Sequence, residues 1–477
     1  MYPLKQTFFV LGLSRSGVAA AEFLLMRKAT VYLYDDVSSE QIENAIIGLE
    51  GLGAKRVSKD LLDRMQEICD ALVLSPGIPI DHPIAVKFRR AGKGVLGETE
   101  LAAREMRCPI IAVTGTNGKT TTVSMLERIF CESGVKAEAC GNIGSPLIHH
   151  LHLTEKDLAI AEISSFQLET LNSLCPHIAL VLNITEDHLN RHYNMENYIF
   201  LKKKLLKNST ETEFVVLNYD DETVRSFAEN TRAKVLFFSM RNKVNGSYVE
   251  NGEIFFLNEK IMKISELTLE GGHNIQNALA AITAARLMGV EAEIIRKALS
   301  EFKGVKHRIE FVGEVDGIKY IDDSKATNVD ATLKAVLALK ENTVLLLGGK
   351  DKGYDYDKLF ANLRSSKVAQ AVIYGENRLK ILESALRMGY KNVTLCKNMS
   401  VAVQLARLSA EKGQTVLLSP ASASFDEFSG YEERGEAFVA IVQSFQKEVE
   451  GARCKCKDGA CYGADCIEFQ NSVEEIE

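Results

Sequence analysis

Residues 110–122 of this chain read IIAVTGTNGKTTT, and they decide the fold of the segment around them. Apolar residues enter a loop that contains two glycines, and apolar residues at helical spacing follow Lys119. The pattern predicts a strand over residues 109–113, a tight loop over residues 114–118 and a helix that begins at Lys119. An apolar strand that leads through a glycine loop into a helix is typical of an α/β fold that binds phosphate.

The loop and the first helical turn carry the groups that a nucleoside triphosphate requires. Glycine lets the backbone N–H groups turn toward phosphate oxygens, and the helix N-terminus adds a partial positive charge. Lys119 adds a full charge, and the Thr120 hydroxyl is placed to hold Mg2+. The candidate nucleotide-binding residues are Gly115, Thr116, Asn117, Gly118, Lys119, Thr120 and Thr121. The loop is shorter than the usual P-loop, since Val113 stands five positions before Gly118, and an ordinary strand–turn–helix is the alternative.

The composition is that of a globular protein without a basic surface for nucleic acid. The chain has 477 residues, of which 46% are hydrophobic and 25% charged, and its net charge is -7. The length predicts about three domains, and the acidic balance argues against a nucleic-acid partner. We find no apolar run long enough to span a bilayer and no signal-peptide pattern, so we expect a cytoplasmic protein without a membrane partner, and a monomer.

Short apolar strands alternate with helical stretches along most of the chain, which predicts parallel sheets. We expect an α/β protein of three domains, over residues 1–94, 95–301 and 302–449. Residues 450–477 are polar and contain four cysteines, Cys454, Cys456, Cys461 and Cys466. Their spacing is not that of a structural zinc site. A flexible tail with incidental thiols is favoured there over metal binding or redox sensing. The other six cysteines are scattered and expected to be reduced.

The loop after the first expected strand, residues 12–17, reads GLSRSG and resembles a dinucleotide-binding loop. The next strand ends at Asp35, and an acidic residue at that distance commonly holds a ribose. Ser14 replaces the glycine that lets a dinucleotide pyrophosphate approach, which argues against a nicotinamide dehydrogenase. A uridine or other mononucleotide diphosphate and a plain strand–helix turn stay as open interpretations.

Three further side chains are candidates for a magnesium site. Glu162 ends an apolar strand, where α/β sheets place their ligands and where a carboxylate can complete the shell begun by Thr120. His188 follows another strand and could be a metal ligand, an acid–base group or a surface residue. Lys202 opens a run of three lysines, which is usually a solvated helix face. A buried lysine that loses its charge could instead react with CO2 and become a carbamate, which is a negatively charged metal ligand.

Three polar loops follow strands of the last segment. Residues 322–328 read DDSKATN, residues 348–353 read GGKDKG, and residues 419–426 read SPASASFD. Each could be simple turn chemistry. Because all three lie at the same edge of one expected sheet, a site for a small anion is the favoured interpretation.

Taken together, the chain resembles the Mur ligase family. The stretches that carry the resemblance, in chain order, are GLSRSG, SPGIP, AVTGTNGKTTT, GNIGSP, EISSFQLE, LNITEDHLNRH, GGHNIQNALAA, HRIEF, IDDSKATN, LGGKDKG and SPASASFDEF. They span about residues 5–447. EISSFQLE, DSKATN and SPASASFDEF resemble the D-glutamate-adding member of the family more than its siblings, and the DNPR-type signature of the diaminopimelate- or lysine-adding ligase is absent.

The resemblance implies a Rossmann-like UDP-binding domain, a P-loop-type central ATPase domain and a C-terminal Rossmann-like domain for the amino acid. It implies ATP and Mg2+ as cofactors and UDP-N-acetylmuramoyl-L-alanine and D-glutamate as substrates, joined by an amide bond through an acyl phosphate. It makes Lys119, His188 and Lys202 catalytic. Thr120 and Glu162 would hold one Mg2+, and His188 and a carbamylated Lys202 a second.

The resemblance also assigns ligand contacts in all three domains. Along the UDP-sugar it places Ser16, Asp35, Gly77 and Asn142. Facing ATP it places Asn274, Asn277 and Arg308. Around D-glutamate it places Lys325, Thr327, Lys352, Ser424 and Tyr431.

Two competing functions are weighed against this one. A folylpolyglutamate synthetase-like ligase has no use for an N-terminal UDP pocket. A nucleotide-gated binding protein without turnover would not need the full set of Lys119, Thr120, Glu162, His188 and Lys202.

Overall fold

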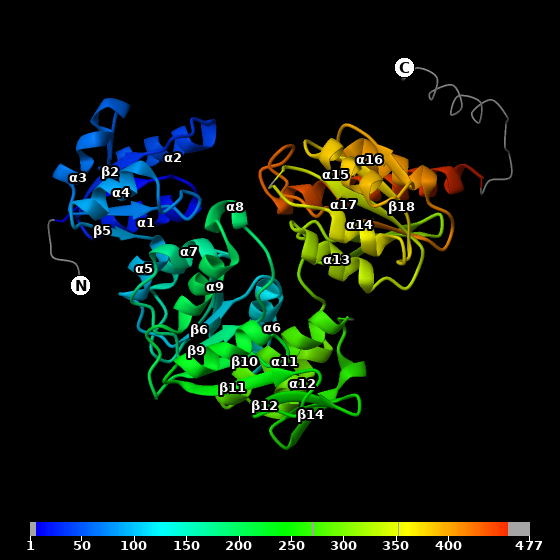
Figure 1. Ribbon diagram of the computed structural model, residues 1–477, viewed down its shortest axis with the longest axis horizontal. Coiled ribbons are helices and arrows are strands. Elements are labelled where there is room, and N and C mark those ends of the chain that lie inside the picture. Colours follow the sequence, from blue (N-terminus) through cyan, green and yellow to red (C-terminus); the bar gives the residue numbers. More distant parts are fainter. Residues whose placement is uncertain (1–5, 270, 352, 457–477) are drawn as a thin grey trace. The chain divides into compact units, whose positions relative to one another are not determined.

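The computed structural model describes residues 6–269, 271–351 and 353–456. The chain divides into two compact units, Met1–Val305 and Lys306–Glu477. The first unit contains two sheets and the second contains one (Figure 1). Within the described residues, no helix combines the length and the apolar character that a membrane crossing requires.

The N-terminal sheet has five parallel strands in the order β3-β2-β1-β4-β5, which is a doubly wound order. Its strands are β1 (Thr7–Leu11), β2 (Thr30–Tyr34), β3 (Lys55–Arg56), β4 (Ala71–Leu74) and β5 (Gly94–Leu96). The helices around it are α1 (Arg15–Met26), α2 (Glu40–Gly51), the 3-10 helix η1 (Lys59–Arg64), α3 (Met65–Ile68) and α4 (Pro83–Arg90). The last strand reaches Leu96, so a division of the chain at residue 94 would cut β5.

The loop after β1 is shorter than the sequence pattern indicated. The expected loop covered residues 12–17, but α1 begins at Arg15 with Ser14 as its N-cap, so Ser16 lies in the first helical turn. A Cβ atom at Gly17 would lie 1.9 Å from the Gly12 carbonyl oxygen. Glycine is therefore required at position 17 because the helix starts directly against the preceding turn.

The central sheet has nine strands in the order β14-β13-β12-β11-β10-β9-β6-β8-β7. The strands from β7 to β12 pair in parallel, and β13 and β14 add an antiparallel edge. The strands are β6 (Ile110–Thr114), β7 (Ala137–Gly141), β8 (Leu158–Glu162), β9 (Ile178–Val181), β10 (Phe214–Asn218), β11 (Lys234–Ser239), β12 (Gly246–Glu250), β13 (Glu253–Phe256) and β14 (Glu259–Lys263).

Helices cover both faces of the central sheet. They are α5 (Glu98–Ala103), α6 (Lys119–Glu132), η2 (Leu147–His150), α7 (Ser165–Thr170), α8 (Leu189–His192), α9 (Met195–Lys203), η3 (Lys204–Leu206), α10 (Glu222–Arg225), η4 (Ser226–Asn230), η5 (Ile264–Glu266), α11 (Gly272–Leu287) and α12 (Ala292–Ser300). Helix α6 packs against α11 and α12 in one apolar core, and α9 contributes to the core on the other face. The expected start of α6 at Lys119 is confirmed.

The second unit contains a sheet of order β15-β16-β20-β17-β18-β19, antiparallel only between β15 and β16. Its strands are β15 (Glu310–Val315), β16 (Ile318–Asp322), β17 (Thr343–Gly348), β18 (Val368–Tyr374), β19 (Val393–Leu395) and β20 (Thr415–Leu418). Its helices are α13 (Val329–Leu337), α14 (Asp357–Leu363), α15 (Arg378–Arg387), α16 (Met399–Ser409) and α17 (Tyr431–Cys456).

Two apolar cores lie on opposite faces of this sheet, so the second unit is also doubly wound. Helix α17 continues to Cys456 and therefore enters the stretch that we expected to be a flexible tail from residue 450. Cys461 and Cys466 lie outside the described residues.

Candidate nucleotide and metal site

The candidate site of the first unit lies at the carboxyl ends of three neighbouring strands. Strand β6 runs between β8 and β9, and its end pairs Val113 with Glu162 and Thr114 with Val181. The polar residues that follow these strands are therefore brought to one edge of the sheet, which is where open α/β sheets bind ligands.

Glu162 joins the helix start to the neighbouring strand. Its two carboxylate oxygens accept hydrogen bonds from the Thr120 hydroxyl and from the Asn142 side-chain amide, each at 2.7 Å. Thr120 and Glu162 are buried, and no ion pair joins Glu162 to a cationic side chain of the described residues. A buried carboxylate beside a hydroxyl, without a paired cation, is a donor set that suits Mg2+. Asn142, expected along the UDP-sugar, contacts this carboxylate, and its role at the sugar stays a prediction.

Two lysines meet at the phosphate loop. The Lys119 ammonium donates to the carbonyls of Gly115 and Thr116 at 2.9 and 2.8 Å. The Lys202 amine donates to the same Gly115 carbonyl at 2.9 Å and to the Thr114 hydroxyl at 3.1 Å. The structure thus brings Lys119 and Lys202, which are distant in the sequence, to one backbone oxygen.

Lys202 is only 1% exposed. Burial, with a further contribution from the Lys119 charge, holds the pKa of its amine well below the ordinary lysine value, although Asp187 and Glu162 act in the opposite direction. A neutral buried amine is the form that can add CO2. Carbamylation of Lys202 stays a prediction with this chemical basis.

The other lysines of the run do not face the phosphate loop. The Lys203 ammonium lies 5.5 Å from the centre of the Phe227 ring, and Lys204 donates to the Leu168 carbonyl at 2.8 Å. One helical turn before Lys202, the Tyr198 hydroxyl lies 3.0 Å from the Thr116 hydroxyl. Spacing on α9 therefore selects Lys202, because of the three lysines it is the one four residues after Tyr198, on the same helix face.

His188 is the N-cap of α8 and has a left-handed backbone conformation, with a φ of 55°. Its ring centre lies 4.7 Å from that of Phe166, and its Nε2 atom lies 3.5 Å from a carboxylate oxygen of Asp187. The role of His188 at a second metal ion stays a prediction. Asp187 is buried, and its charge opposes the lowering of the Lys202 pKa. It is therefore a site residue that sequence reasoning missed, although it stands next to His188.

A second residue that sequence reasoning missed is Asn183. Its side chain accepts a hydrogen bond from the Asn117 backbone N–H at 2.9 Å and donates to the Asn117 carbonyl at 3.0 Å. This pairing fixes the tip of the phosphate loop to the strand next to it. The signal was present, because Asn183 directly follows the apolar run of β9 and Leu182 and opens the polar stretch NITEDH.

The α11 residues expected to face ATP lie against the phosphate loop. Gly118 has a φ of 87°, and a Cβ atom there would lie 2.2 Å from the side-chain oxygen of Asn277. Both Asn274 and Asn277 are buried. Glycine is needed at position 118 for its conformation and for this close approach.

The expected UDP residues are placed around the turn after β1 and the loop after β4. The Asp35 carboxylate accepts hydrogen bonds from the backbone N–H groups of Leu13 and Val37 at 2.6 and 2.9 Å. Arg191 donates to the Gly77 carbonyl at 3.1 Å and to the Ile78 carbonyl at 2.7 Å. Arg191, another residue missed at the sequence level, therefore connects the β4 loop to the central sheet.

In the second unit, the loops after β16 and β20 are held together by Arg434. This side chain is fully buried and donates to the hydroxyl and carbonyl of Ser324 at 2.9 and 2.8 Å, and to the Ser422 carbonyl at 3.1 Å. Its position one turn after Tyr431 on α17 was the available signal, since residues three apart share a helix face.

The residues expected around D-glutamate lie on these loops. The Lys325 ammonium donates to the Tyr431 hydroxyl and lies 4.0 Å from the centre of its ring. Ser424 is buried on the loop after β20, and the Thr327 backbone N–H donates to the Lys325 carbonyl at 2.9 Å. Lys352 lies outside the described residues. Arg308, expected at ATP, lies 3.6 Å from Asp323.

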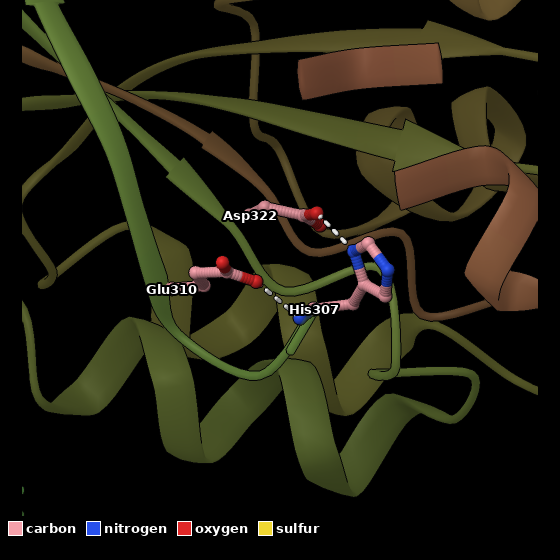
Figure 2. Close-up of side chains that lie close together, drawn as sticks. All are labelled: His307, Glu310 and Asp322. Carbon is pink, nitrogen blue, oxygen red and sulfur yellow. Dashed lines mark hydrogen bonds and ion pairs between the residues drawn. The ribbon is translucent and has the colours of Figure 1, made fainter. Parts of the chain in front are cut away.

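Figure 2 shows a cluster at the start of the second unit, made of His307 and Asp322, which are buried, and Glu310, which is half-buried. The His307 ring nitrogen Nδ1 lies 2.7 Å from a carboxylate oxygen of Asp322, and its backbone N–H donates to Glu310 at 2.6 Å. The three residues have the chemistry of metal ligands. However, the His307 ring nitrogen is already paired with Asp322, and the Glu310 carboxylate already accepts from the His307 backbone. We interpret the cluster as a brace between the first residues of the unit and the end of β16.

The brace gives a prediction about stability. The hydrogen bond to Asp322 raises the pKa of His307 above the ordinary histidine value. The ion pair therefore stabilises the second unit fully below the unfolded-state pKa, and this contribution is lost as the pH rises through the folded-state pKa. We expect Asp322→Asn to cost about 3 kcal/mol at pH 6 and to remove that pH dependence.

The measurement is hydrogen exchange of the β16 amides under increasing urea, at pH 6 and pH 9. The control is Glu341→Gln, which breaks the half-exposed pair with Lys319 and should cost no more than about 1 kcal/mol. An Asp322→Asn protein whose stability varies with pH as the parent's does would contradict the brace.

A glycine loop at the carboxyl edge of a mostly parallel sheet, with a buried carboxylate on the adjacent strand, is the arrangement of an α/β protein that binds phosphate. Comparison with known families is more specific. Residues 113–285 match the Mur ligase middle domain, and residues 307–422 match the Mur ligase, glutamate ligase domain.

Relatives of known name cover nearly the whole chain. The UDP-N-acetylmuramoylalanine–D-glutamate ligase of Caldanaerobacter subterraneus subsp. tengcongensis is 43% identical over 444 residues, which is 92% of this chain and 98% of the relative. That of Clostridioides difficile is 38% identical, with the same shares covered. The chain therefore belongs to the Mur ligase family, among the UDP-N-acetylmuramoylalanine–D-glutamate ligases.

Solved structures agree with the fold. UDP-N-acetylmuramate-alanine ligase MurC from Thermotoga maritima superposes with a TM-score of 0.59 at 19% identity, over 92% of this chain and 99% of that one. MurF ligase from the same organism, in complex with ADP, gives a TM-score of 0.57 at 16% identity, over 94% and 96%. At these identities the likeness shows the shared fold alone.

Proposed function

We propose that this protein is an ATP-dependent ligase that joins D-glutamate to UDP-N-acetylmuramoyl-L-alanine, a step of peptidoglycan precursor synthesis. The observation that carries the proposal is the Glu162 carboxylate, which is buried and bonded to the first helical turn of the phosphate loop. The relatives that bear this activity as their name cover 92% of the chain, which supports the choice of substrates.

The reaction has two steps. The alanyl carboxylate attacks the γ-phosphorus of ATP, which gives an acyl phosphate and releases ADP. The neutral amine of D-glutamate then attacks the acyl carbon, the amide forms and inorganic phosphate leaves. Both steps concentrate negative charge on phosphoryl oxygens, so the site must supply positive charge there.

In this chain Lys119 and the backbone N–H groups of the loop would contact the phosphates. Thr120 and Glu162 would hold a Mg2+ ion, and His188 with a carbamylated Lys202 would hold a second. Bound Mg2+ would neutralise charge on the phosphoryl oxygens. Asn183 holds the phosphate loop next to β9 through the Asn117 backbone. The backbone N–H groups of the loop therefore need little rearrangement to bind phosphate.

For the amino acid we propose the loops of the second unit. Lys325 supplies an ammonium for a carboxylate of D-glutamate, and Ser424 and Thr327 supply hydroxyls. Arg434 fixes the loops that carry them, so we assign it a positioning role. Lys352 belongs to the same proposed set.

Phosphate release with ATP, Mg2+ and UDP-N-acetylmuramoyl-L-alanine tests the function, with D-glutamate, L-glutamate, L-lysine and meso-diaminopimelate compared. We expect turnover with D-glutamate alone, and the amide product by mass spectrometry. Turnover with another amino acid would keep the ligase chemistry and overturn the assignment of the loops. If this protein shows no turnover under conditions in which a reference ligase is active, the ligase assignment fails and the alternative of a nucleotide-binding protein is favoured.

A further inference from the structure

A second basic site lies in the central domain, formed by residues that take no part in the proposed reaction. It is a cavity of about 650 Å3 at the end of α9 and along η3. Its wall is completed by residues 207–210 and 231–232, which come before β10 and β11. Because those strands are parallel to β6, these segments lie at the amino edge of the sheet, opposite the edge that carries the phosphate loop.

The lining of this cavity, which we call the amino-edge pocket, carries four cationic side chains and no carboxylate. The residues that line it are Phe200, Lys203, Lys204, Leu206, Lys207, Asn208, Ser209, Thr210, Thr231 and Arg232. Like charges gathered in a concave, partly desolvated surface repel one another, and an anion of matching charge removes that repulsion.

The nearby protein groups do not supply that anion. Lys207 and Arg232 are exposed, and neither forms an ion pair with a carboxylate among the described residues. Glu211, which directly follows the lining loop, forms no ion pair with either cation among the described residues. Glu213 already accepts hydrogen bonds from the Thr210 N–H and hydroxyl, both at 2.7 Å. Two exposed cations therefore line the cavity without an ion-paired carboxylate among the described residues.

The remaining cations are held in place and give the pocket a fixed positive wall. Lys204 is anchored to the Leu168 and Glu169 carbonyls at 2.8 and 3.0 Å. Lys203 rests on the Phe227 ring. Beside them, the Phe200 ring is 66% exposed and lines the cavity. A flat apolar surface beside cations suits a planar group that is attached to phosphates.

We propose that the amino-edge pocket binds a small multivalent phosphoryl anion, either an inorganic polyphosphate or the polyphosphate of a nucleotide. The arginine fork and the lysine ammonium groups match the geometry and charge of successive phosphoryl groups. The volume admits a ligand of that size and not a folded macromolecule. The net charge of -7 argues against nucleic acid as the occupant.

The test must separate this pocket from the phosphate loop. We would therefore titrate sodium tripolyphosphate, at low salt and by calorimetry, into full-length protein carrying Lys119→Ala, which removes the central cation of the phosphate loop. One site is expected. Adding Lys207→Glu with Arg232→Glu should weaken binding at least about tenfold, as expected from loss of two charge-assisted contacts.

The matched control adds Lys358→Glu with Lys391→Glu, which changes the net charge equally at exposed lysines of the second unit. Binding should then stay at the Lys119→Ala value. If charge reversal impairs folding, as judged by circular dichroism, Lys207→Gln with Arg232→Gln replaces it and should give an intermediate loss. Equal loss in the control, or no binding of tripolyphosphate, would overturn the proposal.

Two more titrations identify the ligand. GTP binding more tightly than tripolyphosphate, with the difference removed by Phe200→Ala, indicates a nucleotide; equal binding indicates an inorganic polyphosphate. A single-stranded RNA that binds through Lys207 and Arg232 while tripolyphosphate does not would overturn the assignment of a small ligand. The proposal does not depend on the ligase reaction, because each experiment measures the binding of a ligand and none measures catalysis.

Discussion

Replacing Lys119 with alanine is expected to lower kcat about 1,000-fold and to raise the KM for ATP. The Lys119 ammonium already lies across the phosphate loop, on the carbonyls of Gly115 and Thr116. Among residues 114–120, Lys119 is the one side chain with a full positive charge that could contact the phosphates. Alanine keeps the helix start but removes the charge that offsets the phosphoryl oxygens as the acyl phosphate forms.

The measurement is steady-state release of ADP with all substrates present. The control is Lys59→Ala, an exposed lysine of η1 in the N-terminal domain, which should leave kcat and KM unchanged. The unfolding of the Lys119→Ala protein should match the parent's, because the side chain is only partly buried. Loss of activity in both variants, or a Lys119→Ala protein with near-normal kcat, would contradict the assigned role.

The phosphate loop could be predicted from sequence because its determinants are local. Gly118 needs its positive φ, and Lys119 and Thr120 follow within two residues, so one short stretch specifies loop, helix start and ligand groups together. Apolar runs similarly identified most strands. The predicted loop before α1 was too long. A helix can begin directly after a turn when a glycine, here Gly17, allows the helix to lie against the Gly12 carbonyl.

The contacts that the sequence could not predict depend on how neighbouring strands are aligned with one another. Asn142 and Glu162 are twenty residues apart, and only the pairing of β7 with β8 brings the amide to the carboxylate. Likewise, a sequence cannot show that Arg434 binds the carbonyls of two separate loops. Lys202 was chosen over its neighbours by the resemblance, and the structure gives the reason, which is burial beneath the phosphate loop.

The second large effect is expected at that lysine. We predict that Lys202→Ala lowers kcat at least about 100-fold, since it removes the amine that would carry the carbamate ligand. It also removes the donor to the Thr114 hydroxyl and leaves the Gly115 carbonyl with Lys119 as its side-chain donor, at a cost of about 1–3 kcal/mol in stability. Circular dichroism and thermal unfolding would separate this loss of stability from the loss of activity.

Lys203→Ala is the matched control, because it removes the same side chain one position along α9, where the ammonium lies on Phe227 instead of under the loop. Carbon-13 bicarbonate should give a carbamate resonance in the parent and in Lys203→Ala, and none in Lys202→Ala. Activity should fall in step with that resonance when CO2 is removed from the buffer. A Lys202→Ala protein that keeps the resonance would place the carbamate elsewhere. Parent protein that is fully active without any resonance would show that Lys202 acts as a free amine, through its hydrogen bonds to the loop.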